Sequence, residues 1–79
     1  MRVRVYLRQP LFALPGVEAH VPDKALVLDA ELTEQQAGGL TLKVDGYYDE
    51  RGRKLEGASA KTRTLIVPAS KIDHLLVVE

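Results

Sequence analysis

Residues 1–8 of the chain read MRVRVYLR, with an apolar side chain at every second position from Val3 to Leu7. Successive side chains of a strand point to opposite faces, so this period of two predicts an extended segment with one buried face. The same alternation returns in LTLKV (residues 40–44). That second strand is expected to run on through Tyr47 and Tyr48 past a bulge at Gly46. Both stretches favour a mostly β fold.

The C-terminal part of the chain predicts two more strands. Residues 62–67 are rich in β-branched side chains and end at Pro68, which favours a strand in the centre of a sheet. Residues 68–71 form a tight turn. A last strand follows, with its core contacts expected from three residues, Ile72, Leu75 and Val77.

Residues 25–36 fit two structures. As a strand they place Leu26, Leu28, Ala30 and Leu32 on one face. As a helix they offer Asp23 as N-cap and Gly38-Gly39 as a stop. The helix would scatter its apolar residues around more than half of its circumference, so the strand is favoured, with a short helical turn at residues 33–37 compatible with either.

The remaining segments are interpreted as connections. Residues 11–22 are irregular, with a turn at Pro15-Gly16 and at most a short edge strand over residues 17–21. Residues 49–52 form a turn that leads into a short, polar returning strand at 53–57. A surface loop follows at 58–61.

Together these elements predict one domain over residues 1–79. Its fold class is mostly β: a small antiparallel barrel or rolled sheet of five to six strands, with room for one short helix. Closure is expected because an open stack of hairpins would leave long unpaired edges.

Composition limits the classes of protein that the chain can belong to. It has 79 residues, no cysteine, and 11 basic against 11 acidic side chains. A core this small gives only marginal stability, which small proteins often increase by disulfides or by association with other subunits. Because the chain has no cysteine, we expect a homo-oligomer. No apolar stretch is long enough to span a membrane and residues 1–5 do not resemble a secretory leader, so we expect a cytoplasmic protein.

No combination of residues indicates catalysis. Ser70, Asp73 and His74 are the residue types of a serine hydrolase, but neighbours on one strand point to opposite faces, so Asp73 is not expected to orient His74. No nucleotide-binding or zinc-protease motif occurs. We therefore expect a protein that is not an enzyme and that needs no cofactor.

The acidic residues near the hairpin, Asp45, Asp49 and Glu50, do not have the spacing of a calcium loop, so no metal site is predicted. Of Tyr47 and Tyr48, one ring is expected in the core and the other at the surface, where it could stack on a base or a partner.

Basic residues supply the one candidate binding face. Its members come from the first strand and from the region of residues 51–63: Arg2, Arg4, Tyr6, Arg8, Arg53 and Arg63. If the two groups adjoin, they form a basic patch with an aromatic ring, suited to single-stranded RNA or a phosphate-bearing ligand. If they lie apart, they form a solvated face neutralised by Asp29, Glu31 and Glu56. The second interpretation is favoured, and the first stays open.

The stretch TLIVPASKIDHL (residues 64–75) resembles the closing strands of Sm-like and SH3-like small barrels, in which an apolar strand, a tight turn and a final strand complete the fold. The resemblance covers about the second half of the chain, with the strand at residues 39–44 at the matching distance. It implies ring formation through the edges of the terminal strands and binding of single-stranded RNA. Residues 35–39 lack the Asp and Asn that Sm-like proteins use for base contact, and Pro68-Ala69-Ser70 replaces their Arg-Gly turn, so no RNA-contacting residue carries over.

The sequence thus predicts a binding or assembly module with a homo-oligomeric, protein or RNA partner and no membrane. The alternatives are a purely structural oligomer and a small-ligand-binding barrel.

Overall fold

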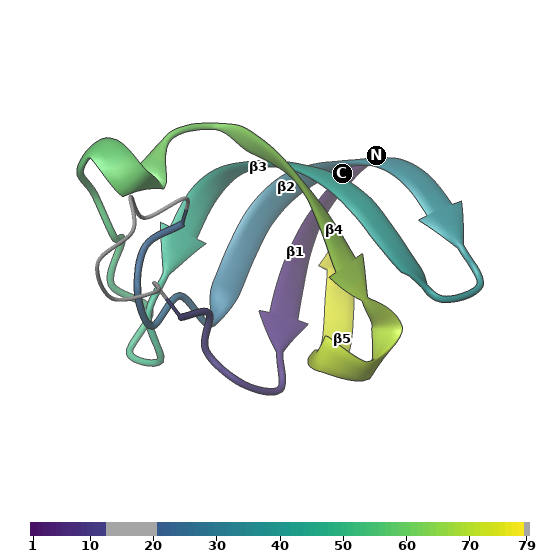
Figure 1. Cartoon of the computed structure of the whole chain (residues 1–79), viewed down its shortest axis with the longest axis horizontal. Helices are drawn as coiled ribbons and strands as arrows, with labels where there is room; N and C mark the ends of the chain where they lie inside the picture. Colours follow the sequence, from purple (N-terminus) through teal and green to yellow (C-terminus); the bar gives the residue numbers. More distant parts are fainter. Residues whose placement is uncertain (13–20, 79) are drawn as a thin grey trace.

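Five antiparallel strands form one sheet in a computed structural model that describes residues 1–12 and 21–78. The strand order is β4-β3-β2-β1-β5, and no described residue lies in an α-helix (Figure 1). The strands are β1 (Arg2–Leu7), β2 (Val27–Gln36), β3 (Gly39–Tyr48), β4 (Arg63–Pro68) and β5 (Ile72–Val77). Two 3₁₀ turns connect them, η1 (Ala58–Ala60) and η2 (Ala69–Lys71). The predicted fold class, mostly β and antiparallel, is confirmed.

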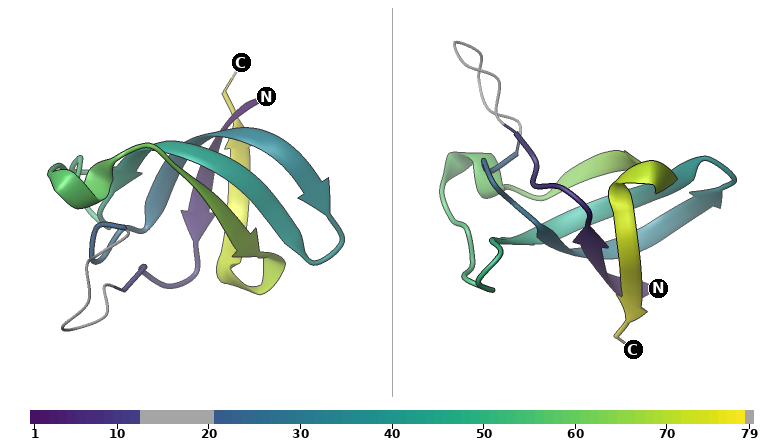
Figure 2. Two further views of the ribbon diagram at one scale, coloured as in Figure 1. Left: turned by 45° about the horizontal axis from the view of Figure 1, so that its top comes forward. Right: turned by 90° about the horizontal axis from the view of Figure 1, so that it is seen from below.

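The sheet is rolled but not closed (Figures 1 and 2). Within the described residues, β4 pairs only with β3 and β5 only with β1. Strands β4 and β5 follow each other through η2, so the two ends of the sheet are joined by a turn instead of a ladder. The rolled-sheet form of the prediction is therefore the one observed, and the open edges that closure was expected to remove are present on β4 and β5.

The core lies on one side of this sheet, here called the inner face. Its largest fully buried side chains are Tyr47, Leu28, Leu42, Val3, Val5 and Val44. They sit at alternate positions of the three central strands, as the period of two requires. The opposite side, the outer face, carries the polar members of the same strands.

Residues 25–36 are a strand and not a helix. Leu28 and Ala30 are buried and Asp29 points to the other face, as the favoured interpretation predicted. The expected helical turn at residues 33–37 is wrong, because Gln35 pairs with Leu40 and Gln36 pairs with Gly39. The hairpin simply continues to its turn, since β3 is long enough to partner these residues.

A bulge in β3 lies where Gly46 predicted it. Ala30 pairs with Val44 and Asp29 with Gly46, so Asp45 has no partner of its own in β2. An added Cβ at Gly46 would lie 3.2 Å from the Cβ of Asp29. Beyond the bulge, Tyr47 is fully buried and Tyr48 is half-buried, which confirms the prediction of one core ring and one surface ring.

Two expectations about the second half of the chain are wrong. β4 is an edge strand and not a central one, and its Ile66 is 77% exposed. Val67 is buried on the inner face while Ile66 lies on the outer face, and in the described part of the chain no strand pairs with the far side of β4. The polar segment 53–57 forms no strand; a single bridge joins Lys54 to Tyr48. The partner of β3 is instead β4, beyond η1.

The last strand also differs from its prediction. Ile72 packs against the core, but Leu75 and Val77 are 36% and 49% exposed. They do point to the inner face, because they pair with Val5 and Val3. They stay accessible since β4 does not cover them.

The connection from β1 to β2 is described at its two ends. The N–H of Leu11 donates to the carbonyl of Ala25 at 2.9 Å, and the N–H of Lys24 donates to the carbonyl of Leu11 at 2.8 Å. The predicted turn at Pro15-Gly16 and most of the predicted segment 17–21 lie outside the described residues. Within the part of the chain that the structure describes, no helix is long and apolar enough to span a bilayer.

Candidate functional site

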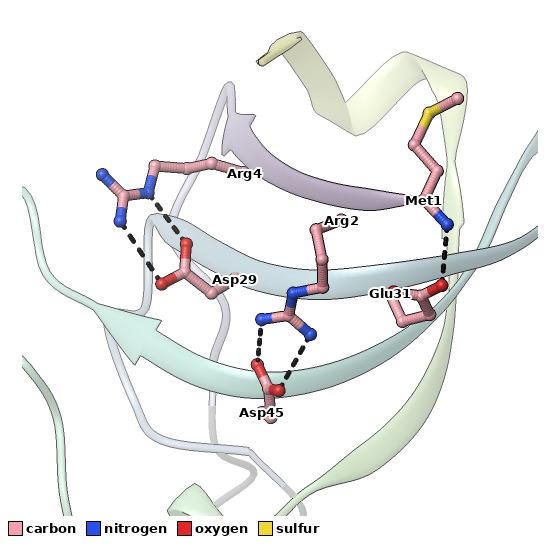
Figure 3. Close-up of polar contacts among 6 residues, drawn as sticks. All are labelled: Met1, Arg2, Arg4, Asp29, Glu31 and Asp45. Carbon is pink, nitrogen blue, oxygen red and sulfur yellow. Dashed lines mark hydrogen bonds and ion pairs between the residues drawn. The ribbon is translucent and has the colours of Figure 1, made fainter. Parts of the chain in front are cut away.

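The arginines of β1 are neutralised by carboxylates on the outer face (Figure 3). Both terminal nitrogens of Arg2 donate to Asp45 at 2.9 Å. Arg4 donates from Nε and Nη2 to Asp29 at 2.8 and 3.3 Å. The N-terminal amine of Met1 binds Glu31 at 2.7 Å. Two-pronged contacts of this kind fix geometry as well as charge.

The pKa values of Arg4 and Asp29 both shift in the direction that favours the charged form of each side chain. The hydrogen bond from Arg4 lowers the pKa of Asp29, with burial opposing the change. The bond to Asp29 raises the pKa of Arg4 further above its already high value. Asp29 was expected as a neutralising partner, and it lies directly across from Arg4 in the β1–β2 ladder.

Aromatic rings flank the Arg4–Asp29 pair. The Arg4 guanidinium lies 5.6 Å from the centre of the Tyr48 ring, within cation–π range. Tyr6 stacks on His74 of β5, with ring centres 4.3 Å apart and planes 14° from parallel. A shallow cleft of about 310 Å³ lies between these groups, lined by Arg4, Tyr6, Val27, Tyr48 and Gly52. The outer face of β1 is therefore an ion-paired, partly aromatic surface.

The other predicted members of the basic face are held by separate contacts away from Arg2 and Arg4. Arg8 donates from Nε to the carbonyl of Ile72 at 3.2 Å. Arg53 binds Asp49 at 3.0 Å in the loop after β3. Arg63 shares a face with Val44, its partner in β3, so it lies on the inner side of the sheet, where its Nε is buried without a hydrogen bond. Arg2, Arg4 and Tyr6 are thus brought together, and Arg63 is apart from them.

The residues considered for catalysis show one contact that was not expected. Asp73 Oδ2 and His74 Nδ1 are 2.9 Å apart, although alternation placed the two side chains on opposite faces. The ladder between β1 and β5 shifts at Tyr6/Leu7, and Asp73 has no partner in β1 there, so the strict alternation breaks at this point. Ser70 lies in η2, and no hydrogen bond links it to His74 among the contacts of the described residues.

The carboxylates of Asp45 and Asp49 bind groups of the chain itself. Asp45 binds Arg2, and Asp49 Oδ1 accepts the backbone N–H groups of Arg51 and Arg53, each at 2.9 Å. These bonds, that from Arg53 first, lower the pKa of Asp49. No group of three or more His, Cys, Asp or Glu side chains in residues 1–12 and 21–78 has the arrangement of a metal site.

A larger cleft of about 500 Å³ lies between the ends of the β1–β2 connection and the turn after β3. Its lining combines apolar and charged side chains: Pro10, Phe12, Lys24, Asp49, Glu50, Arg51 and Arg53. Phe12 is 72% exposed. No described residue forms an ion pair with Lys24 or with the side chain of Arg51. Nothing in the sequence indicated this cleft, because its two walls are far apart along the chain.

Among the described residues, a run of exposed large hydrophobic side chains follows β5. Leu75, Leu76, Val77 and Val78 are 36%, 51%, 49% and 51% exposed. Leu75 and Val77 point to the inner face, and Leu76 pairs with Arg4 and so points to the outer face. Clustered exposed aliphatic side chains mark interaction surfaces more often than single ones do. The apolar residues of the C-terminal segment predicted the strand β5. They could not predict that, within the described residues, one edge of β5 pairs with no other strand.

No family model, curated protein or solved structure matches this chain.

Proposed function

We propose that this chain is a non-catalytic assembly module whose β5 edge associates with other copies of the chain. The observation that carries the proposal is the row of exposed aliphatic residues 75–78 on a strand whose outer backbone edge pairs with no strand among residues 1–12 and 21–78. Unpaired backbone groups beside apolar side chains are a template for strand pairing, which natural proteins otherwise block with charges, proline or a covering segment.

The resemblance to Sm-like barrels supports the same conclusion. In that family the edges of the terminal strands join subunits, and the resemblance would lead us to expect the same of the edge strands β4 and β5. The small size of the core supports it as well. Pairing at β5 would cover Leu75 and Val77, which the single chain leaves exposed on its inner face.

Assembly is favoured over RNA binding by the state of the arginines. Arg2 and Arg4 are held by Asp45 and Asp29, so the outer face of β1 offers little positive charge that a phosphate backbone could use. Binding of that kind needs several cations that release counterions. We therefore expect no salt-dependent binding of single-stranded oligonucleotides, even at low ionic strength.

Sedimentation equilibrium tests the assembly proposal directly. We expect the wild-type chain to have a mass above that of the monomer, and Leu76→Lys to reduce it to the monomer mass, because a lysine would be placed in the apolar contact. Thr64→Lys, exposed on the outer face of β4, is the matched control and should leave the mass unchanged. A wild-type chain that stays monomeric at millimolar concentration would exclude the proposal, as would a Leu76→Lys chain that assembles like wild type.

The larger cleft favours a second candidate function, binding of a small carboxylate that carries an apolar group. Its volume lies in the range of ligand sites, and it places Phe12 near two cations that no described residue neutralises, Lys24 and Arg51. We expect phenylacetate to shift the amide NMR signals of Lys24 and Arg51, and benzylamine, which has the same ring and the opposite charge, to leave them unmoved.

The charge-reversed double variant Lys24→Glu/Arg51→Glu should lose the phenylacetate response. Equal responses to the two probes, or an unchanged response in the variant, would refute this second function.

A further inference from the structure

The open edge of β5 exposes the backbone of two residues. The N–H of Val78 donates to the carbonyl of Arg2 at 3.1 Å. In an antiparallel ladder the residues that bond a given neighbour alternate, so residues 74, 76 and 78 turn toward β1. The N–H and carbonyl groups of Leu75 and Val77 therefore point away from β1, to the open side.

The open edge of β4 has a different character. The N–H of Ala69 donates to the carbonyl of Gly38 at 2.9 Å, in register with the β3–β4 ladder. By the same alternation, Thr64, Ile66 and Pro68 are the residues whose backbone faces outward. Pro68 has no N–H to donate, and proline on an outward position is a common protection of an edge strand. Residues 74–78 contain neither proline nor a charged Asp, Glu, Lys or Arg, so this part of the β5 edge lacks that protection; the charged residue of β5, Asp73, lies near the start of the strand.

Side-chain direction distinguishes between the possible pairs of edges. Residues directly opposite each other in a ladder have their side chains on the same face. The outward-bonding residues of β5, Leu75 and Val77, have inner-face side chains, whereas those of β4, such as Ile66, have outer-face side chains. Antiparallel pairing of β5 with β4 of another copy would therefore join an inner face to an outer face. Pairing β5 with β5 joins inner face to inner face.

We propose that the partner of β5 is β5 of a second copy, antiparallel and related by a two-fold axis at Leu76. In this register Leu75 lies opposite Val77 of the second copy, and both of their N–H and carbonyl groups are bonded. Leu76 lies opposite Leu76 of the second copy on the outer face. The two inner faces become continuous across the axis, and the aliphatic side chains 75–77 of each copy cover those of the other.

The symmetry limits the size of the assembly. A two-fold contact uses the same patch on both subunits and closes at two copies, whereas a β4–β5 contact repeats and produces a ring or a filament. This inference rests on the assembly function proposed above, and it adds the partner strand, the register and a dimeric state.

Cysteine cross-linking tests the register, because the chain has no cysteine of its own. Leu76→Cys places two thiols opposite each other at the axis, in a non-hydrogen-bonded pair with Cα atoms about 4.5 Å apart, which a disulfide can bridge. Under mild oxidation we expect the Leu76→Cys monomer to be converted into a disulfide-linked dimer. Leu75→Cys lies opposite Val77 and should remain monomeric on a denaturing gel. Ile66→Cys, on the β4 edge, measures the background of random collisions.

The possible results separate this inference from the assembly function. Cross-linking of Leu76→Cys alone, with a wild-type mass of two chains, supports the two-fold contact. A wild-type dimer in which Leu75→Cys or Ile66→Cys cross-links as fast as Leu76→Cys overturns the register but not the function. A wild-type assembly larger than a dimer overturns the two-fold contact in favour of a repeating one. A monomer overturns both.

Discussion

At the scale of single residues, the Asp29 carboxylate makes stability depend on pH. Its folded pKa is lowered chiefly by Arg4. A lowered folded pKa contributes stability that is fully present above the unfolded value, about 4, and is lost as the pH falls through the folded value. We expect Asp29→Asn to lose about 1 kcal/mol or less at pH 7, since half-exposed ion pairs contribute little.

The measurement is urea unfolding of wild type and Asp29→Asn at pH 7 and at pH 3. The variant should lose less stability between the two pH values, with a residual slope from Asp49, whose pKa is also lowered. Equal losses in the two proteins would show that Arg4 does not stabilise the ionised form of Asp29. In an Arg4→Met background, the substitution Asp29→Asn should change the free energy of unfolding at pH 7 by less than it does in the wild-type chain.

The sequence predicted part of this residue chemistry. The alternation of arginine with valine in β1 correctly placed Arg2, Arg4 and Tyr6 together, and Asp29 was anticipated as a neutralising partner. Asp45 as the partner of Arg2 was not, because the two residues are not paired in adjacent strands and a bulge directs Asp45 toward β1. A contact between side chains of β1 and β3 depends on how both strands are aligned with β2. The periodicity of a single segment does not predict that alignment.

At the scale of elements, the β3–β4 ladder supplies a paired test of packing at two adjacent glycines. An added Cβ at Gly39 would lie 2.5 Å from the carbonyl oxygen of Val67, a backbone atom that cannot move without opening the ladder. An added Cβ at Gly38 would meet nothing within 4 Å. We expect Gly39→Ala to destabilise the fold by about 1–3 kcal/mol, the usual cost of overpacking. Gly38→Ala should be close to neutral.

Chemical denaturation of the two variants, compared with wild type, measures the difference. If both alanine variants unfold at the wild-type midpoint, the close approach of β3 and β4 at this end is wrong. If both are destabilised equally, the turn conformation and not the contact with Val67 is the cause.

The same elements show what periodicity can and cannot predict. Apolar alternation identified β1, β2 and β3, whereas the β-branched and apolar content of the C-terminal part identified β4 and β5. The same content placed β4 in the centre of the sheet and Leu75 and Val77 in the core, and both predictions are wrong for one reason. Apolar content shows that a strand has a buried face, but whether its two edges are paired depends on strands elsewhere in the chain, and here β4 and β5 end the sheet.

At the scale of the whole molecule, the proposed β5 contact would link folding to assembly. The single chain leaves Leu75 and Val77 accessible on the face that holds its core, and in the proposed dimer the second copy would cover them. Association that requires the folded state stabilises that state by mass action. In the proposed dimer, folding and dimerisation are coupled, so the stability of the chain would depend on its concentration.

We therefore expect the thermal midpoint of the wild-type chain to rise over a concentration range of about a hundredfold, as linkage requires of a dimer that dissociates on unfolding. Leu76→Lys should have a midpoint that is independent of concentration, because the monomer unfolds without dissociating. Scanning calorimetry of both proteins measures this, with Thr64→Lys as the variant that should retain the wild-type dependence. A wild-type midpoint that does not move over this range would show that the folded chain does not dimerise at these concentrations, which contradicts the proposed β5 contact.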